Sequence, residues 1–147
     1  MFVHQISVYL TNQNGALSRL TGLLADHNID ILALMIADTT EFGIVRFIVK
    51  NEDIQTCLDL LKDAGYSARK NHVVCAKIDN RPGGLNRILR FLDSSGISVE
   101  YLYSFNYSND DQNALIIFRL SDKDGARLLL ENGFTVVSQE DIDRLGK

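Results

Sequence analysis

Residues 80–88 read NRPGGLNRI, and a related stretch, NQNGALSRL, occupies residues 12–20. The two stretches start 68 residues apart. Further along the chain the spacing becomes 71 and pairs Phe47 with Phe118. A repeat of this length is the signature of a supersecondary unit that occurs more than once. The 147 residues therefore contain two copies of one unit.

The first copy shows alternating strand and helix patterns. Strands are indicated by period-two alternation or by short apolar runs, and helices by apolar residues at helical spacing. The expected elements are a strand at 5–10, a helix carrying Leu17, Leu20 and Leu24, strands at 29–37 and 44–49, a helix carrying Ile54, Leu58 and Leu61, and a strand at 66–72.

The second copy repeats this order and ends in a short tail. Its expected elements are strands at 73–79, 97–106, 114–120 and 134–137, with helices carrying Leu85, Ile88, Leu89 and Leu92, and then Ala126, Leu129 and Leu130. In the tail, Ser138 and Asp141 have the spacing of a capping box, which predicts a last short helix. We expect domains at 1–72 and 73–147, with no flexible linker between them.

The order strand-helix-strand-strand-helix-strand is that of the ferredoxin-like unit, an α+β fold. Residues 31–37 are apolar on both faces of their expected strand, so a second layer should cover it, either another chain or the other copy. We therefore expect a homodimer or larger assembly. An aromatic stripe in the second copy is expected to be core or interface rather than a ligand cage. It comprises Val99, Tyr101, Tyr103, Phe105 and Tyr107.

Composition excludes several classes of function. The net charge of −4 disfavours a nucleic-acid binder, and no apolar run approaches the ~18 residues of a membrane span. The N-terminus lacks the basic and apolar regions of a signal peptide. Cys57 and Cys75 have apolar neighbours and fit reduced thiols of a cytoplasmic protein. The three histidines lack metal-ligand spacing, and no nucleophile–base pattern is present, so we expect no metal, no cofactor and no catalytic residue.

The repeated loop has the chemistry of a binding site for a zwitterion. Glycine allows close approach of the backbone, and the helix start behind it presents N–H groups that suit a carboxylate. Asparagine can both donate and accept, so Asn12 and Asn80 could meet an ammonium or a carboxylate group. The alternative is that glycine and asparagine only form a tight turn.

Residues 80–85 (NRPGGL) resemble the loop of the ACT domain family, which comprises small amino-acid-sensing regulatory modules. Residues 5–19 are similar to the start of acetolactate synthase regulatory subunits. The resemblance implies two ferredoxin-like βαββαβ ACT units packed side by side, with antiparallel sheets, helices on one face and an amino acid at the seam. The ligand-binding residues implied by it are Asn12, Gly15, Ala16, Leu17, Asp30, Asn80, Arg81, Gly83, Gly84, Leu85 and Ser98.

The two loops differ in how well they follow the family pattern. Asn14 stands where the family usually has proline, so the second loop is the better candidate. Three functions stay open at this stage. The first is an amino-acid-binding regulatory protein without catalytic activity. The second is a regulatory subunit of a separate metabolic enzyme, such as acetolactate synthase. The third is an RNA binder of the same topology, which the net charge disfavours.

Overall fold

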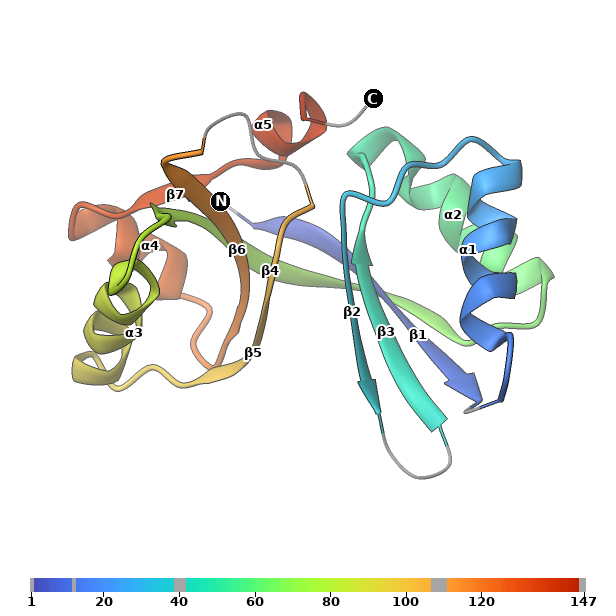
Figure 1. The fold of residues 1–147 in the computed structure, drawn as a ribbon, viewed down its shortest axis with the longest axis horizontal. Coiled ribbons are helices and arrows are strands. Elements are labelled where there is room, and N and C mark those ends of the chain that lie inside the picture. Colours follow the sequence, from blue (N-terminus) through green and yellow to red (C-terminus); the bar gives the residue numbers. More distant parts are fainter. Residues whose placement is uncertain (1, 12, 39–41, 107–110, 146–147) are drawn as a thin grey trace.

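The computed structural model describes residues 2–11, 13–38, 42–106 and 111–145 (Figure 1). Two units follow each other along the chain. The first unit contains β1 (Val3–Thr11), α1 (Ala16–Asp26), β2 (Ala33–Asp38), β3 (Phe42–Ile48), the 3₁₀ turn η1 (Asn51–Asp53), α2 (Ile54–Asp63) and the first half of β4 (Ala68–Asp79). The second contains the other half of β4, α3 (Gly84–Ser94), β5 (Val99–Ser104), β6 (Asn113–Leu120), α4 (Gly125–Glu131), β7 (Thr135–Val137) and α5 (Gln139–Asp143).

Strand β4 belongs to both units. Its residues 68–73 pair with β1, and its residues 74–79 pair with β6. The strands follow the path β2-β3-β1-β4-β6-β5, with β7 also paired to β4 and every pairing antiparallel. Each half has the strand order of a ferredoxin-like unit, so this part of the prediction is confirmed. The pairing changes partner one residue after the expected boundary at residue 72, which lies inside a continuous strand.

The two units lie next to each other, and each keeps its first two α-helices on one face of its own half of the sheet. Figure 1 shows α1 and α2 on one outer side of the molecule and α3 and α4 on the other. The opposite faces of the two halves meet in the middle, where β2 contacts β5 and Ile142 of α5 also packs. The chain therefore has four layers, with helices outermost.

Each unit has a core between its helices and its sheet. In the first, Leu20 and Leu24 of α1 and Leu61 of α2 pack on Ile6 and Phe47. In the second, Ile88, Leu92 and Leu129 pack on Val74 and Phe118. These are residues of the predicted helical and strand patterns.

A third core joins the two units. Ala33 and Met35 of β2 pack there with Tyr103 of β5 and with Phe105, which follows β5. The second layer over Leu32, Ala33 and Met35 is thus the other copy, which removes most of the argument for a second chain, whereas Ile36 stays exposed. The aromatic stripe is core as expected, but with one exception. A register shift between Val99 and Tyr101 turns Val99 toward the helices of its own unit. Tyr107 lies outside the described residues.

The unit–unit core contains one buried polar network. Gln5 of β1 is fully buried, and its side chain contacts side chains of β4 and β5. Its Nε2 donates to the Tyr101 hydroxyl at 2.8 Å and to Asn71 Oδ1 at 3.2 Å. Its Oε1 accepts from the Tyr103 hydroxyl at 2.6 Å. The network therefore spans both units.

Candidate functional site

The second glycine loop is tightly held at the end of β4. The Asn80 amide donates to the Gln112 carbonyl at 2.8 Å, and Asn80 Nδ2 donates to the Asp111 carbonyl at 3.2 Å. Gly83 has φ +88°, a left-handed conformation in which glycine is favoured. A Cβ on Gly84 would clash with the Asp79 carbonyl oxygen, so the start of α3 lies directly against the strand end.

Helix α3 starts without a side-chain cap. Gly83 occupies the N-cap position, and no side chain accepts a hydrogen bond there. The first N–H groups of an α-helix lack intrahelical partners and carry a partial positive charge. The same holds at Gly15, the uncapped N-cap of α1, with φ +84°. Both helix starts thus offer backbone donors suited to a carboxylate.

A hollow of about 440 Å³ adjoins the second loop. Its lining combines carboxylates with amide and guanidinium groups: Asp79, Asn80, Arg81, Asp111, Gln112 and Asn113. Arg81 forms an ion pair with Asp79, with 3.2 Å between Nη2 and Oδ2, and the Arg81 side chain is 75% exposed. Such an exposed pair is weak, so a ligand carboxylate can compete for the guanidinium. Acidic and donor groups side by side match the two charges of an amino acid.

The first loop differs in its surroundings. Asn12 lies outside the described residues. Ala16 is buried, and Leu17 packs against the core of the first unit. Leu85 packs in the same way in the second unit. Ala16 and the two leucines are therefore structural contacts of the two cores, and their part in a binding site stays a prediction.

The two loops point to opposite ends of the molecule. They follow β1 and β4, which are antiparallel neighbours, so on the order of 40 Å of strand separates them. Asp30 precedes β2 and Ser98 precedes β5. Each of these two strands runs parallel to the strand before the loop of its own unit. Asp30 and Ser98 therefore lie at the sheet end away from that loop, and one unit alone does not bring loop and strand start together.

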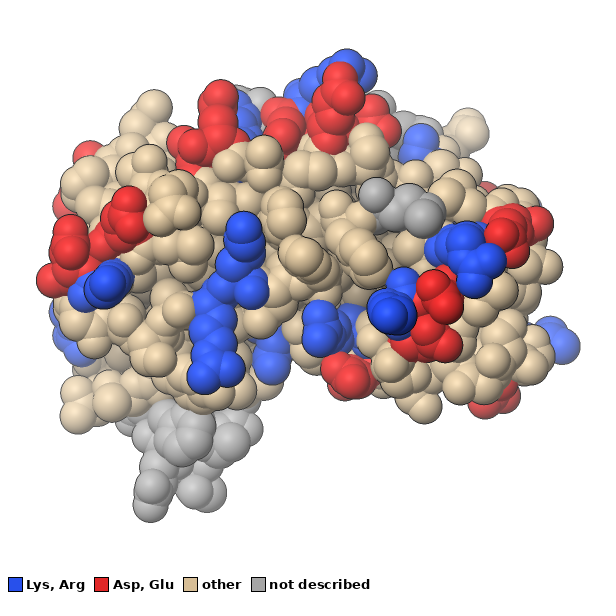
Figure 2. Space-filling model, turned by 180° about the vertical axis from the view of Figure 1, so that it is seen from behind, with Lys and Arg blue, Asp and Glu red and all other residues tan. Residues whose placement is uncertain are grey.

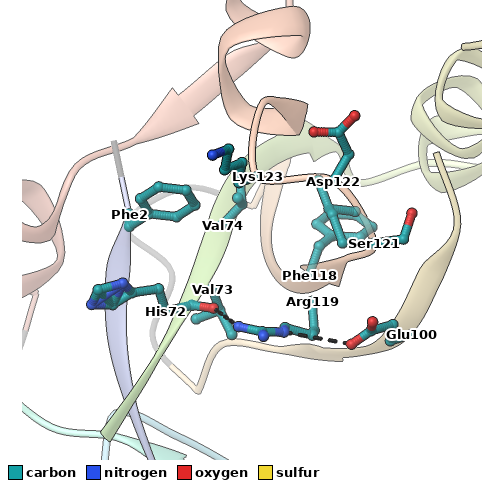
Figure 3. A pocket seen from close by; sticks show the side chains of 11 residues that line it. Phe2, His72, Val73, Val74, Glu100, Phe118, Arg119, Ser121, Asp122 and Lys123 are labelled. Carbon is teal, nitrogen blue, oxygen red and sulfur yellow. Dashed lines mark hydrogen bonds and ion pairs between the residues drawn. The ribbon is translucent and has the colours of Figure 1, made fainter.

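A second pocket was missed by the sequence reasoning. It has a volume of about 420 Å³ and lies where the second unit meets the N-terminal segment (Figure 3). Its lining comes from four separate stretches of chain: Phe2, residues 72–74, Glu100 and residues 118–123. Arg119 Nη1 donates to the His72 carbonyl at 2.6 Å, and Arg119 Nε lies 3.5 Å from Glu100. No single motif contains these residues, although the repeat relates each stretch from 72 onward to a position in the first unit.

Burial shifts the pKa of several groups. It raises the pKa of each thiol, Cys57 and Cys75, to about 12, so both buried, free cysteines are unreactive. Burial also raises the pKa of Tyr103, with the neighbouring Tyr101 as a smaller cause. It lowers the pKa of His4, with Lys70 and His72 as further causes, against an opposing effect of Asp143. None of these groups forms a nucleophile–base pair.

The surface carries both signs of charge. On the face shown in Figure 2, basic side chains form a column near the middle, and acidic ones gather along the upper rim and both ends. Among the described residues, no cluster of three His, Cys, Asp or Glu side chains could hold a metal ion. None of the described helices is both long and apolar enough to cross a membrane.

Comparison with known proteins agrees with this architecture. A family model described as an ACT domain pair matches residues 1–145. The crystal structure of protein BT0572 from Bacteroides thetaiotaomicron is 33% identical, with a TM-score of 0.87, and the match covers 99% of this chain and 98% of that one.

More distant solved structures share the fold alone. The regulatory subunit of aspartate kinase from Thermus thermophilus is 15% identical, with a TM-score of 0.63, over 88% of this chain and 92% of that chain. The corresponding subunit from Thermus flavus is 16% identical, with a TM-score of 0.63, over 89% and 90%. No curated protein sequence matches.

Proposed function

The chain belongs to the ACT domain pair family, and from this premise we propose that it is a regulatory protein that binds a free amino acid. It has no catalytic activity of its own. The observation that carries the proposal is the second loop, where Asn80 and Arg81 line the 440 Å³ hollow and Gly83, shortly after them in the chain, is the uncapped N-cap of α3. We place the protein in the cytoplasm, where the buried thiols stay reduced.

In this proposal, hydrogen-bond donors hold the carboxylate of the ligand and carboxylates of the protein face its ammonium group. The Leu85 N–H group and the Arg81 guanidinium receive the carboxylate, since the Gly84 amide already donates to the Arg81 carbonyl at 3.0 Å. Asn80 orients the backbone groups of the ligand, and Asp79 or Asp111 faces its ammonium group. Gly83 lets the backbone approach the ligand closely. The first loop, with Gly15, Ala16 and Leu17, is the weaker candidate because Asn14 replaces the usual proline.

A seam at this loop requires a second chain. Within one chain, the loop of each unit points away from the other unit, and Asp30 and Ser98 lie at the opposite sheet ends. A neighbouring copy in the reverse orientation would bring a strand start to the loop. Strands β2 and β5 end the strand path and are the edges open to such pairing. We therefore propose a homodimer that completes the seam with Asp30 or Ser98 of the second copy.

Thermal shift against all the amino acids tests the function. A ligand at about 100 times its Kd stabilises the folded state by about 2.7 kcal/mol. This corresponds to about 5–10 °C in Tm for a protein of this size. Asn80→Ala should remove most of the shift and leave the unliganded Tm nearly unchanged, because its side chain is exposed. The matched change Asn12→Ala should matter less.

Several results of these experiments would contradict the proposal. No shift with any amino acid at millimolar concentration leaves only the fold in common with the family. An equal shift in wild type and Asn80→Ala moves the site elsewhere. Light scattering on the protein with and without ligand measures the dimer, and a ligand-bound monomer would contradict the intermolecular seam.

A separate enzyme of amino-acid metabolism is the alternative partner. Solved structures with the same fold include regulatory subunits of aspartate kinase, which motivates a partner of that class. Acetolactate synthase is less favoured because the second unit here repeats the first. Affinity capture with purified candidate enzymes distinguishes a regulatory subunit from a free-standing sensor.

A further inference from the structure

Helix α5 closes one end of the first unit, next to η1. The Asn51 amide donates to the Asp143 carboxylate at 2.9 Å, and the His4 amide donates to Gln139 Oε1 at 2.9 Å. Ile142 is fully buried, in the same cluster as Leu32 and Ile48. The fold thus places a carboxylate and an apolar side chain at this end of the unit.

The repeat identifies the equivalent place in the second unit. By the spacings of 68 and 71 residues, His4 corresponds to His72 and Asn51 to Asp122. The backbone turn is also the same, because the Gly125 amide donates to the Asp122 carbonyl as the Ile54 amide donates to the Asn51 carbonyl. No described helix covers this end, and the 420 Å³ pocket of Figure 3 opens there.

The pocket has an apolar side and a polar side. Phe2 stacks on His72 with ring centroids 5.6 Å apart, and Val74 and Phe118 contribute further apolar lining. In Figure 3 the Lys123 amine extends toward the side of Phe2, Asp122 lies on the far side, and the Arg119–Glu100 pair lies below them. The lining can therefore receive an apolar body and a charged group at once.

We propose that this pocket binds a small carboxylate with an apolar body. The carboxylate accepts from the Asp122 amide and lies beside Lys123, as Asp143 accepts from the equivalent Asn51 amide. Within the described residues nothing accepts a hydrogen bond from the Asp122 amide. The apolar body packs on Phe2 and Val74.

A small molecule fits the pocket better than a second helix like α5. Leu32 and Ile48 share their apolar cluster with Ile142, but the equivalent positions hold Glu100 and Arg119. Burying that ion pair under an apolar helix face would cost desolvation energy. The volume also lies in the range of roughly 300–1,000 Å³ found for small-molecule sites. This site is separate from the Asn80 loop and does not rest on binding there.

Amide chemical shifts of the full chain test the proposal. The probes are phenylalanine, isoleucine and the 2-oxo acid of each, with phenylalaninamide as the control that lacks a carboxylate. At least one acid should shift the Asp122 and Lys123 amides in a saturable manner. Glu100 favours the amino acids, whereas equal binding of the 2-oxo acids would assign recognition to the carboxylate alone. Either result supports the pocket.

Matched variants separate this site from others. Lys123→Glu should weaken binding by about tenfold or more. Lys62→Glu, the same charge change on an exposed lysine of α2, should leave it unchanged. Asn80→Ala should also leave it unchanged, so failure of the loop site and failure of this pocket are distinguishable.

Four outcomes would overturn the proposal. The first is the absence of any shift of the Asp122 amide with every acid up to about 10 mM. The second is binding of phenylalaninamide as tight as that of the acids, and the third is equal affinity of the Lys123→Glu and Lys62→Glu variants. The fourth is that only a peptide of residues 138–145, and none of the acids, shifts the Asp122 amide in a saturable manner. The last would assign the pocket to a protein segment.

Discussion

His4 is a histidine whose charged form is disfavoured in the folded chain. Its Nδ1 is buried, and no described group is within hydrogen-bonding reach of it. The centroid of its ring lies 4.9 Å from that of the His72 ring. Burial lowers the pKa of His4, and the charges of Lys70 and His72 lower it further, whereas Asp143 of α5 raises it. Protonating His4 therefore works against the fold.

This arrangement predicts a loss of stability in mild acid. In the unfolded chain His4 takes up a proton near the ordinary histidine pKa of 6.5, whereas in the folded chain it does so only at lower pH. The unfolded state then binds more protons, so the free energy of unfolding falls as the pH drops below about 6.5. Tm measured at about pH 7.5 and about pH 5.5 should fall less in His4→Gln than in wild type. His27→Gln, at an exposed helix end, is the control, and equal falls in all three proteins would exclude His4 as the cause.

At the scale of elements, the start of α3 depends on a glycine pair with two different constraints. Gly83 needs its left-handed φ but has open space around its Cα, whereas Gly84 has an ordinary φ but no room for a Cβ beside the Asp79 carbonyl. In the first unit, Gly15 keeps the φ constraint, but Ala16 stands at the second position. The close contact between the start of α3 and the end of β4, which leaves no room for a Cβ, is thus a feature of the second unit.

The two constraints predict different losses of folding stability when each glycine is replaced by alanine. Gly83→Ala should destabilise the protein by about 1–2 kcal/mol, the cost of a left-handed non-glycine residue. Gly84→Ala should cost more, at or above the roughly 1–3 kcal/mol of overpacking, because a backbone carbonyl must move. Urea unfolding measures both. A smaller loss for Gly84→Ala would mean that α3 moves away from β4 without resistance.

The elements were largely predictable, and the errors have physical causes. The repeat predicted their order, and Ser138 does cap α5 by accepting from the Asp141 amide. Residues 29–32 were expected in a strand, but β2 begins only at Ala33. Ile29 and Leu32 are buried in irregular chain, so their apolar character reports burial rather than strand. The long shared strand was predicted as two, because partner exchange along β4 leaves no local signal.

The sequence predicts which residues form the candidate site, and that set stays a prediction, but it does not predict how the fold places the two loops. The loop chemistry around Asn80 and Gly83 is local and could be read from the sequence. That the two loops point apart follows from the β1–β4 pairing, which joins distant residues. The second pocket could have been noticed by comparing the copies, since Glu100 and Arg119 replace Leu32 and Ile48 at equivalent positions.

At the scale of the whole molecule, the Gln5 network holds the two units in register. Tyr103 is the donor to Gln5 Oε1, and Tyr101 is one of several acceptors for Gln5 Nε2. Arg46 of the first unit also lies over the Tyr101 ring, 4.1 Å from its centroid. A buried polar group without its partner costs about 1–3 kcal/mol.

The network predicts unequal effects of two similar substitutions. Tyr103→Phe should destabilise the protein by about 1–3 kcal/mol, because it leaves Gln5 Oε1 without its donor. Tyr101→Phe should cost less, since Nε2 keeps Asn71 and Ser7 as acceptors. Both variants should unfold in one transition by circular dichroism and tyrosine fluorescence, because β4 and the shared core belong to both units. Separate transitions would show that the units unfold independently.

The two open strand edges also limit the symmetry of any assembly. A dimer with a single two-fold axis closes both edges only if β2 of each copy pairs with β5 of the other. If β2 instead pairs with β2 of a second copy, both β5 edges stay open, and pairing them in turn adds further copies until the assembly closes or grows as a fibre. The same chain can thus form a closed ring of two or a growing fibre, and the choice depends on which edge meets which.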